Sequence, residues 1–102
     1  MTETDICKAI LAAICKRYSG RGLFYRRNVG AIKIADRYVE FGIAGQADIA
    51  GILGGDAYEI EIKSATGRQS PAQKRWQSAV ERAGGVYILA RSVEDCLSKM
   101  PD

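Results

Sequence analysis

Three residues of this chain, Asp48, Glu61 and Lys63, have types and a spacing that suit metal-assisted chemistry on a phosphate. On a β-strand, side chains two positions apart project from the same face, so Glu61 and Lys63 point the same way. The glycine pair 54–55 predicts a hairpin, and pairing about its centre places Asp48 directly opposite Glu61. Like charges so placed are destabilising unless a cation compensates them. The pattern therefore favours a site for a divalent ion.

Mg²⁺ or Mn²⁺ suits such a site, because Mg²⁺ takes one or two carboxylates and completes its shell with water and phosphate oxygens. Lys63 alongside would orient an attacking water or stabilise charge that develops on the phosphate. The alternative for the same residues is a half-exposed strand whose alternating charged side chains form only a solvated outer face. The spacing alone leaves both interpretations open.

The chain has no histidine, which excludes several catalytic designs. These are serine and cysteine hydrolases with a histidine base, histidine-ligated zinc hydrolases, and nucleases that use a histidine base. Neither GxxxxGK[ST] nor a GxGxxG after a strand is present. Cys7, Cys15 and Cys96 are too far apart for a CxxC zinc pattern, and we expect buried free thiols. An enzyme with this sequence must therefore rely on carboxylates, lysine, amides and a hard metal ion.

Charge is distributed unevenly along the chain, whose formal net charge is +3. Segment 16–37 carries seven basic side chains against one acid, segment 48–62 carries four acids and no base, and segment 63–82 carries five bases against one acid. An acidic centre between basic segments is typical of a phosphate-binding surface around a metal site, although such charges also simply cover small domains. The candidate phosphate contacts are Arg21, Arg26, Arg27, Lys33, Lys74 and Arg75.

Hydrophobic periodicity and turn residues predict the elements that must position these side chains. We expect a helix over 4–18 and strands over 23–29, 37–41, 48–53 and 57–63, with a turn at 35–36. Ser70, Pro71 and Gln73 predict the capped start of a second helix, which runs to about residue 83 with Trp76 inward. A strand at 86–90 and a short helix from 92 follow. The order predicts a small α/β domain whose mixed β-sheet is flanked by helices, with strand 86–90 parallel to 57–63.

Several motifs together resemble the PD-(D/E)XK nuclease superfamily, and within it the VRR-NUC group of small phage and prophage nucleases. They are GQADI at 45–49, EIK at 61–63, GRQSPAQ at 67–73, the glycine pair 84–85, and the strand that ends in ARS at 90–92. RRNVG at 26–30 and a first helix that opens with Glu3 are also similar, so the likeness covers nearly the whole chain. Ala47 stands where proline would precede the aspartate.

The resemblance implies an α-β-β-β-α-β restriction-endonuclease-like core plus a short C-terminal helix, as one VRR-NUC-like nuclease domain over 1–102. It implies the following roles: Asp48 and Glu61 as metal ligands, the Ile62 backbone carbonyl as a third ligand, Lys63 as the catalytic lysine, Gln73 as the glutamine of the helix after the core strand, and Glu3 as the acid of the first helix and a further ligand. For Gln73 a purely local helix cap competes, and for Glu3 a first-turn acid favoured by the helix dipole competes.

The implied activity is a Mg²⁺- or Mn²⁺-dependent endodeoxyribonuclease, a hydrolase that acts as a homodimer on branched DNA such as a Holliday junction. A different class remains open, namely a non-catalytic nucleic-acid-binding module or a phage replication or packaging accessory factor. We expect no membrane span and no signal peptide, and a cytoplasmic location in a bacterial host that carries the phage or prophage.

Overall fold

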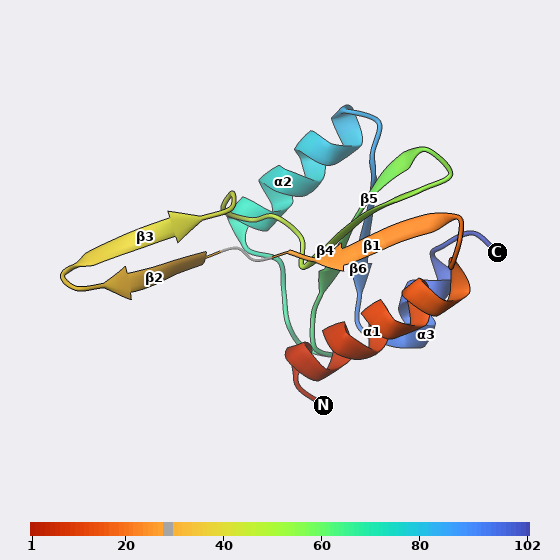
Figure 1. The fold of residues 1–102 in the computed structure, drawn as a ribbon, viewed down its shortest axis with the longest axis horizontal. Coiled ribbons are helices and arrows are strands. Elements are labelled where there is room, and N and C mark those ends of the chain that lie inside the picture. The colour runs from red at the N-terminus through yellow and green to blue at the C-terminus, as the bar shows by residue number, and fades with distance from the viewer. Residues whose placement is uncertain (28–29) are drawn as a thin grey trace.

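The structure is a computed structural model that describes residues 1–27 and 30–102. Asn28 and Val29, which belong to the strand expected over 23–29 and to the RRNVG segment, lie outside the described residues. The elements follow in the order α1 (Glu3–Arg17), β1 (Gly22–Arg26), β2 (Gly30–Ile34), β3 (Arg37–Phe41), β4 (Ile49–Leu53), β5 (Asp56–Ile62), α2 (Pro71–Arg82), β6 (Val86–Ala90) and α3 (Val93–Ser98) (Figure 1).

Four strands form the main sheet in the order β1-β4-β5-β6. β1, β4 and β5 pair in antiparallel fashion, whereas β6 runs parallel to β5 after the crossover through α2. Gly54 and Gly55 have φ values of 60° and 85°, as the predicted hairpin turn between β4 and β5 requires. The expected small mixed sheet flanked by helices is therefore confirmed.

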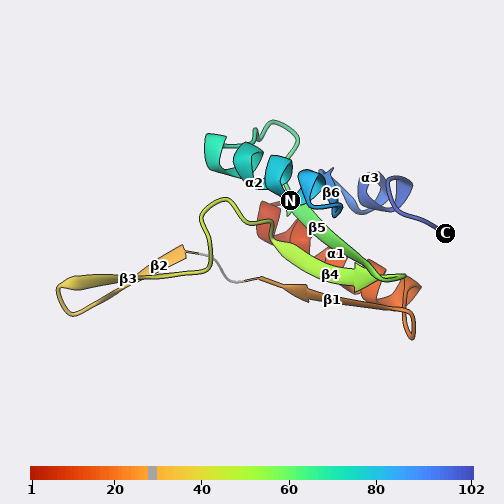
Figure 2. The same cartoon turned by 90° about the horizontal axis from the view of Figure 1, so that it is seen from above.

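A second sheet contains only β2 and β3, and it projects from the body of the molecule (Figures 1 and 2). The sequence pattern predicted a connection between residues 30 and 36; this prediction is wrong over β2, whereas the turn expected at 35–36 is present. The strands meet at a tight turn in which Ala35 has a φ of 57°, a conformation that residues other than glycine rarely adopt. The usual glycine or asparagine signal for such a hairpin is therefore missing from the sequence.

The helices begin where the capping residues predict. Thr2 and Asp5 form a capping box at α1, and Ser70 and Gln73 form the predicted one at α2. The main core lies between α1, α3 and one face of the sheet, and its fully buried members include Ile10, Ile14, Tyr18, Ile49, Ile60, Ile62 and Cys96. The buried face fixes the register of β4 and β5, because every second residue of each strand must point into the core.

Two expectations about burial were wrong. α2 has no fully buried residue: Trp76 points inward and contacts Glu59 but is only half-buried, and Ala79 and Ala83, which were also expected inward, are exposed. α2 lies on the sheet face opposite α1 and covers only part of it. The apolar side of α2 therefore remains partly exposed to solvent. Cys7 and Cys96 are buried as expected, but Cys15 is exposed. Within the described residues, no helix combines the length and apolar character that crossing a membrane requires.

Candidate active site

Asp48 and Glu61 meet across the end of the β4–β5 pair. The register joins Ile49 to Ile60, so the next position outward brings Asp48 opposite Glu61, as pairing about the hairpin predicted. Asp48 Oδ2 accepts a hydrogen bond from the Ile62 backbone N–H at 2.8 Å. The Asp48 carbonyl in turn accepts from the Arg27 backbone N–H at 2.7 Å. The aspartate is thus held from both neighbouring strands.

Glu61 is almost fully enclosed, with 2% of its surface exposed. Its Oε2 accepts a hydrogen bond from Gln73 Nε2 at 2.9 Å and lies 3.8 Å from Lys63 Nζ. Its Oε1 is buried and has no hydrogen-bond partner among the described residues. The alternative interpretation, in which Glu61 belongs to a solvated outer strand face, is therefore wrong. The acid is directed into the protein rather than to solvent, and one of its oxygens is buried without a hydrogen bond among the described residues.

Burial and the nearby charge of Asp48 raise the pKa of Glu61 to about 8, and Lys63 only partly opposes them. A carboxylate in this setting ionises readily only if positive charge approaches it. A divalent ion between Asp48 and Glu61 would supply that charge, and carboxylate oxygens are the donors that Mg²⁺ and Mn²⁺ prefer. Among the side chains that the structure describes, no group of three or more Asp, Glu or Cys is arranged so that it could hold a metal ion. Two carboxylates are nevertheless enough for Mg²⁺.

Gln73 contacts both its own helix cap and the buried acid. Its side-chain Oε1 accepts from the Ser70 backbone N–H at 2.8 Å, which completes the helix cap, while its Nε2 donates to Glu61. The loop that leads to Asp48 passes directly over this helix start: a Cβ on Gly45, whose φ is +87°, would lie 2.3 Å from the Ala72 carbonyl oxygen. The glycine of the GQADI motif is therefore required by a close approach of two backbones.

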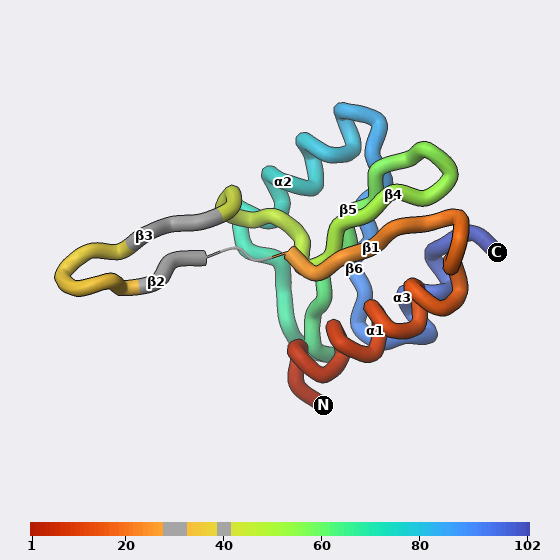
Figure 3. The backbone as a smooth tube through the Cα atoms, in the orientation of Figure 1, coloured from red at the N-terminus to blue at the C-terminus, as the bar shows by residue number. Residues whose placement is uncertain are grey.

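Glu3 reaches the opposite side of the site. The start of α1 lies beside the loop that follows β5 (Figure 3), and Glu3 Oε2 accepts a hydrogen bond from the Ser64 backbone N–H at 3.2 Å. A Cβ on Gly67 would lie 3.2 Å from that oxygen and 3.3 Å from Lys63 Cδ. Glu3 is thus a neighbour of Lys63, and its role as a metal ligand stays a prediction, as does that of the Ile62 carbonyl.

Sequence reasoning missed a second buried acid, Glu59, which is 7% exposed. The Arg27 guanidinium donates two hydrogen bonds to this carboxylate, one of them from Nη2 to Oε2 at 2.9 Å, and Trp76 Nε1 donates to Oε1 at 2.6 Å. The contact with Glu59 raises the pKa of Arg27. Glu59 lies two positions before Glu61, and Trp76 lies one helical turn after Gln73. Each pair therefore lies on one face of its own element, and this pattern is the signal that could have indicated the contact of Trp76 with Glu59.

The candidate phosphate contacts separate into groups. Arg26 is exposed at the end of β1, where it is the pairing partner of Ile49, and Lys74 and Arg75 are exposed on α2 directly after Gln73. Lys33 is exposed on the β2–β3 hairpin. Arg27 has the buried partner Glu59. Arg21 precedes β1 at its far end and donates to the Asp102 carbonyl at 2.9 Å, so it lies away from the carboxylates.

The fold of this chain is shared with a domain of known structure. A mixed sheet flanked by helices carries two carboxylates across one antiparallel strand pair, with a lysine two positions after the second, as the motif resemblance implied. A solved structure described as a "VRR_NUC domain" is similar over 89% of this chain and 89% of its own length, with a TM-score of 0.60 and 17% sequence identity. This chain therefore has the fold of a VRR_NUC domain. No family model and no curated protein matches it in sequence.

Proposed function

We propose that this chain is a metal-dependent DNA endonuclease that hydrolyses phosphodiester bonds. The observation that carries the proposal is the buried Glu61 carboxylate, whose Oε1 has no partner among the described residues and which lies beside Asp48. A buried polar atom without a partner costs free energy, and a cation at this position would remove the cost. The likeness to a VRR_NUC domain supports the same activity.

Asp48 and Glu61 would hold Mg²⁺ or Mn²⁺, with the Ile62 carbonyl as a third protein ligand and Glu3 as a further candidate. When bound, the ion supplies positive charge to the phosphate oxygens and acidifies water. Gln73 donates to Glu61 Oε2, so Oε1 would remain available to bind the ion. Lys63 Nζ, 3.8 Å from the same Oε2, orients the attacking water or stabilises charge on the phosphate.

The substrate we propose is branched DNA such as a Holliday junction, cut by a homodimer. One domain with one site cuts one strand, so paired incisions need two copies with paired sites. An exposed apolar face, made of Leu23, Tyr25 and Ile52, supports the dimer: these side chains are 67%, 54% and 56% exposed. The setting we propose is the cytoplasm of a bacterial host, with the protein encoded by a phage or prophage.

The test is cleavage of labelled four-way junction, flap, duplex and single-stranded DNA with Mg²⁺ or Mn²⁺. The Asp48→Ala variant removes a proposed ligand, and Asp56→Ala, which removes an exposed acid from the same hairpin, is the matched control. We expect cleavage of the junction that EDTA and Asp48→Ala abolish and Asp56→Ala preserves. A gel shift of branched DNA without any cleavage would instead favour the non-catalytic binding module or an accessory factor in phage replication or packaging.

A further inference from the structure

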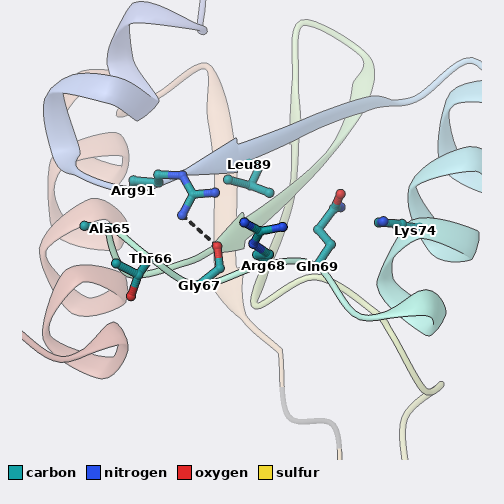
Figure 4. Close-up of a pocket in the computed structure, with 8 residues that line it drawn as sticks. All are labelled: Ala65, Thr66, Gly67, Arg68, Gln69, Lys74, Leu89 and Arg91. Carbon is teal, nitrogen blue, oxygen red and sulfur yellow. Dashed lines mark hydrogen bonds between the residues drawn. The ribbon is translucent and has the colours of Figure 1, made fainter.

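A cavity of about 620 Å³ lies beside the carboxylate site, between the loop after β5, the start of α2 and the end of β6 (Figure 4). Three cationic side chains line it, those of Arg68, Lys74 and Arg91, and no carboxylate does. The nucleic-acid contacts predicted from the sequence include only Lys74 of these three. Arg68 and Arg91 were not predicted, because they lie 23 positions apart and only the fold brings them together.

Each wall of the cavity is next to a residue of the proposed active site. Leu89 in the β6 wall is the pairing partner of Glu61, and neighbouring strands lie ~4.8 Å apart. Lys74 directly follows Gln73 on α2. The loop wall includes Gly67, where a Cβ would lie 3.3 Å from Lys63 Cδ. The cavity therefore begins about one strand spacing from Glu61.

Hydrogen bonds hold the loop wall in place. Arg91 Nη1 donates to the carbonyl oxygens of Ser64 and Gly67 at 2.5 and 2.8 Å, and Figure 4 shows the second of these bonds. Gln69 Nε2 donates to Gln77 Oε1 at 2.9 Å and to the Tyr87 hydroxyl at 3.2 Å. A wall that is ordered before a ligand arrives lowers the entropic cost of binding.

No described acidic side chain forms an ion pair with the three cationic side chains of the cavity. Within 1–27 and 30–102, Arg68 and Lys74 form no ion pair, and Arg91 donates its backbone N–H to Asp95 Oδ2 at 2.9 Å. Asp95 does not line the cavity, and its carboxylate also pairs with Lys99 at 3.1 Å. A concave site with guanidinium groups and an ammonium group, but no lining acid, suits phosphate oxygens.

We propose that this cavity binds a phosphate group of the nucleic-acid strand, one that neighbours the phosphate at Asp48 and Glu61. The proposal rests on the proposed function for the identity of the strand. Phosphates follow one another every ~3.4 Å along the helix axis of a strand, so a group one or two nucleotides from the scissile bond reaches the cavity. Contacts of this kind position the strand without reading its bases.

The test is the binding of a short fluorescent single-stranded oligonucleotide, followed by anisotropy at several salt concentrations without divalent metal. The variants are Arg68→Gln and Arg68→Gln with Lys74→Gln, and the matched control is Arg82→Gln, an exposed arginine at the other end of α2. Arg68 is exposed and forms no side-chain hydrogen bond in the described part of the chain, so its variant should fold, and thermal unfolding verifies this.

We expect Arg68→Gln to weaken binding about fivefold and to reduce the salt slope by ~0.7, the value for one phosphate contact on a single strand. The double variant should lose more, and Arg82→Gln should change affinity less than about twofold. Equal effects of Arg68→Gln and Arg82→Gln, or no binding by the unmodified protein at low salt, would overturn the proposal.

Oligonucleotides with a 5′-phosphate and with a 5′-hydroxyl distinguish the source of the phosphate. If Arg68→Gln weakens the binding of both oligonucleotides, the cavity binds an internal phosphodiester. If it weakens the binding of the 5′-phosphorylated oligonucleotide alone, the cavity binds a terminal phosphate. Parallel cleavage assays separate this proposal from the nuclease. If the Arg68 variants lose binding but the unmodified protein cleaves no DNA, the nuclease proposal is refuted and the phosphate-binding cavity is supported. If the unmodified protein cleaves DNA but the double variant binds as tightly as it does, the nuclease proposal is supported and the cavity proposal is refuted.

Discussion

Gln73 connects the start of α2 to the buried acid: Nε2 donates to Glu61 Oε2 at 2.9 Å, and Oε1 accepts from the Ser70 backbone N–H at 2.8 Å. The amide therefore serves as a helix cap and as a support for the carboxylate at once. Any movement of α2 along the sheet would break one contact or the other. The helix position and the orientation of Glu61 are consequently coupled.

Two substitutions separate these roles. Ser70→Ala removes the hydroxyl that accepts from the Gln73 backbone N–H but keeps the backbone N–H that donates to the Gln73 amide, so it should lower the free energy of unfolding by about 1 kcal/mol while cleavage persists. Gln73→Glu keeps a side chain that caps well but places a second acid against Glu61, so cleavage should fall at least tenfold with little loss of helix stability. Thermal unfolding and single-turnover cleavage measure the two effects. Equal loss of cleavage in both variants would contradict the positioning role.

Glu61 should make the metal-free protein less stable as the pH rises. Its pKa is raised from 4.5 to about 8, so between these values the folded chain binds a proton that the unfolded chain has released. The free energy of unfolding therefore falls from pH 4.5 to pH 8 in EDTA. Glu61→Gln should flatten this decline, while Glu81→Gln, an exposed acid on α2, should leave it in place. Thermal melts across this pH range measure it, and a slope unchanged in Glu61→Gln would refute the assignment.

We expect the main effect of substituting Arg27 to be a lower free energy of unfolding rather than weaker DNA binding. Arg27→Gln leaves Glu59 buried beside Trp76 without its cationic partner, and such losses cost about 3 kcal/mol. The double variant Arg27→Met with Glu59→Met should recover much of this loss, because it removes both charges. Urea unfolding of Arg27→Met, Glu59→Met and the double variant forms the double-mutant cycle, and Arg27→Gln tests the loss of the cation alone. If Arg27 served mainly as a phosphate contact, Arg27→Gln would unfold at the same urea concentration as the unmodified protein.

Gly45 should tolerate no side chain, because its φ is +87° and an added Cβ would lie 2.3 Å from the Ala72 carbonyl oxygen. Gly20 has a similar φ of +83° but no atom within 4 Å of an added Cβ, so Gly20→Ala measures the conformational cost alone, about 1–2 kcal/mol. Gly45→Ala should be clearly more destabilising and should also reduce cleavage. Comparable melting temperatures for the two variants would rule out a close approach at Gly45.

The exposed apolar face should hold the proposed dimer together. Ile52→Lys introduces a charge at a side chain that is 56% exposed, so the folded monomer should tolerate it while a second copy does not. Sedimentation equilibrium should show a shift towards monomer. The control is Ile34→Lys on the β2–β3 hairpin, where the side chain is 55% exposed. An identical monomer–dimer balance in both variants would place the interface elsewhere.

Local patterns were sufficient for much of the fold and for the centre of the site. The glycine pair 54–55 set the register that brings Asp48 opposite Glu61, because a two-residue turn leaves one pairing that keeps the apolar faces together. The caps at Ser70 and Ser92 marked helix starts, because they satisfy free backbone N–H groups by short-range hydrogen bonds. The parallel β5–β6 step followed from chain connectivity.

Only the tertiary structure decided which of the alternating charges are buried. Glu59 and Glu61 have the spacing of a solvated strand face, yet α2 and the Gly45 loop cover them. The contact of Arg27 with Glu59 and the meeting of Arg68 with Arg91 also join distant segments. A strand's period of two determines which side chains share a face. Whether that face meets water or another element depends on packing between segments far apart in sequence, which no local pattern records.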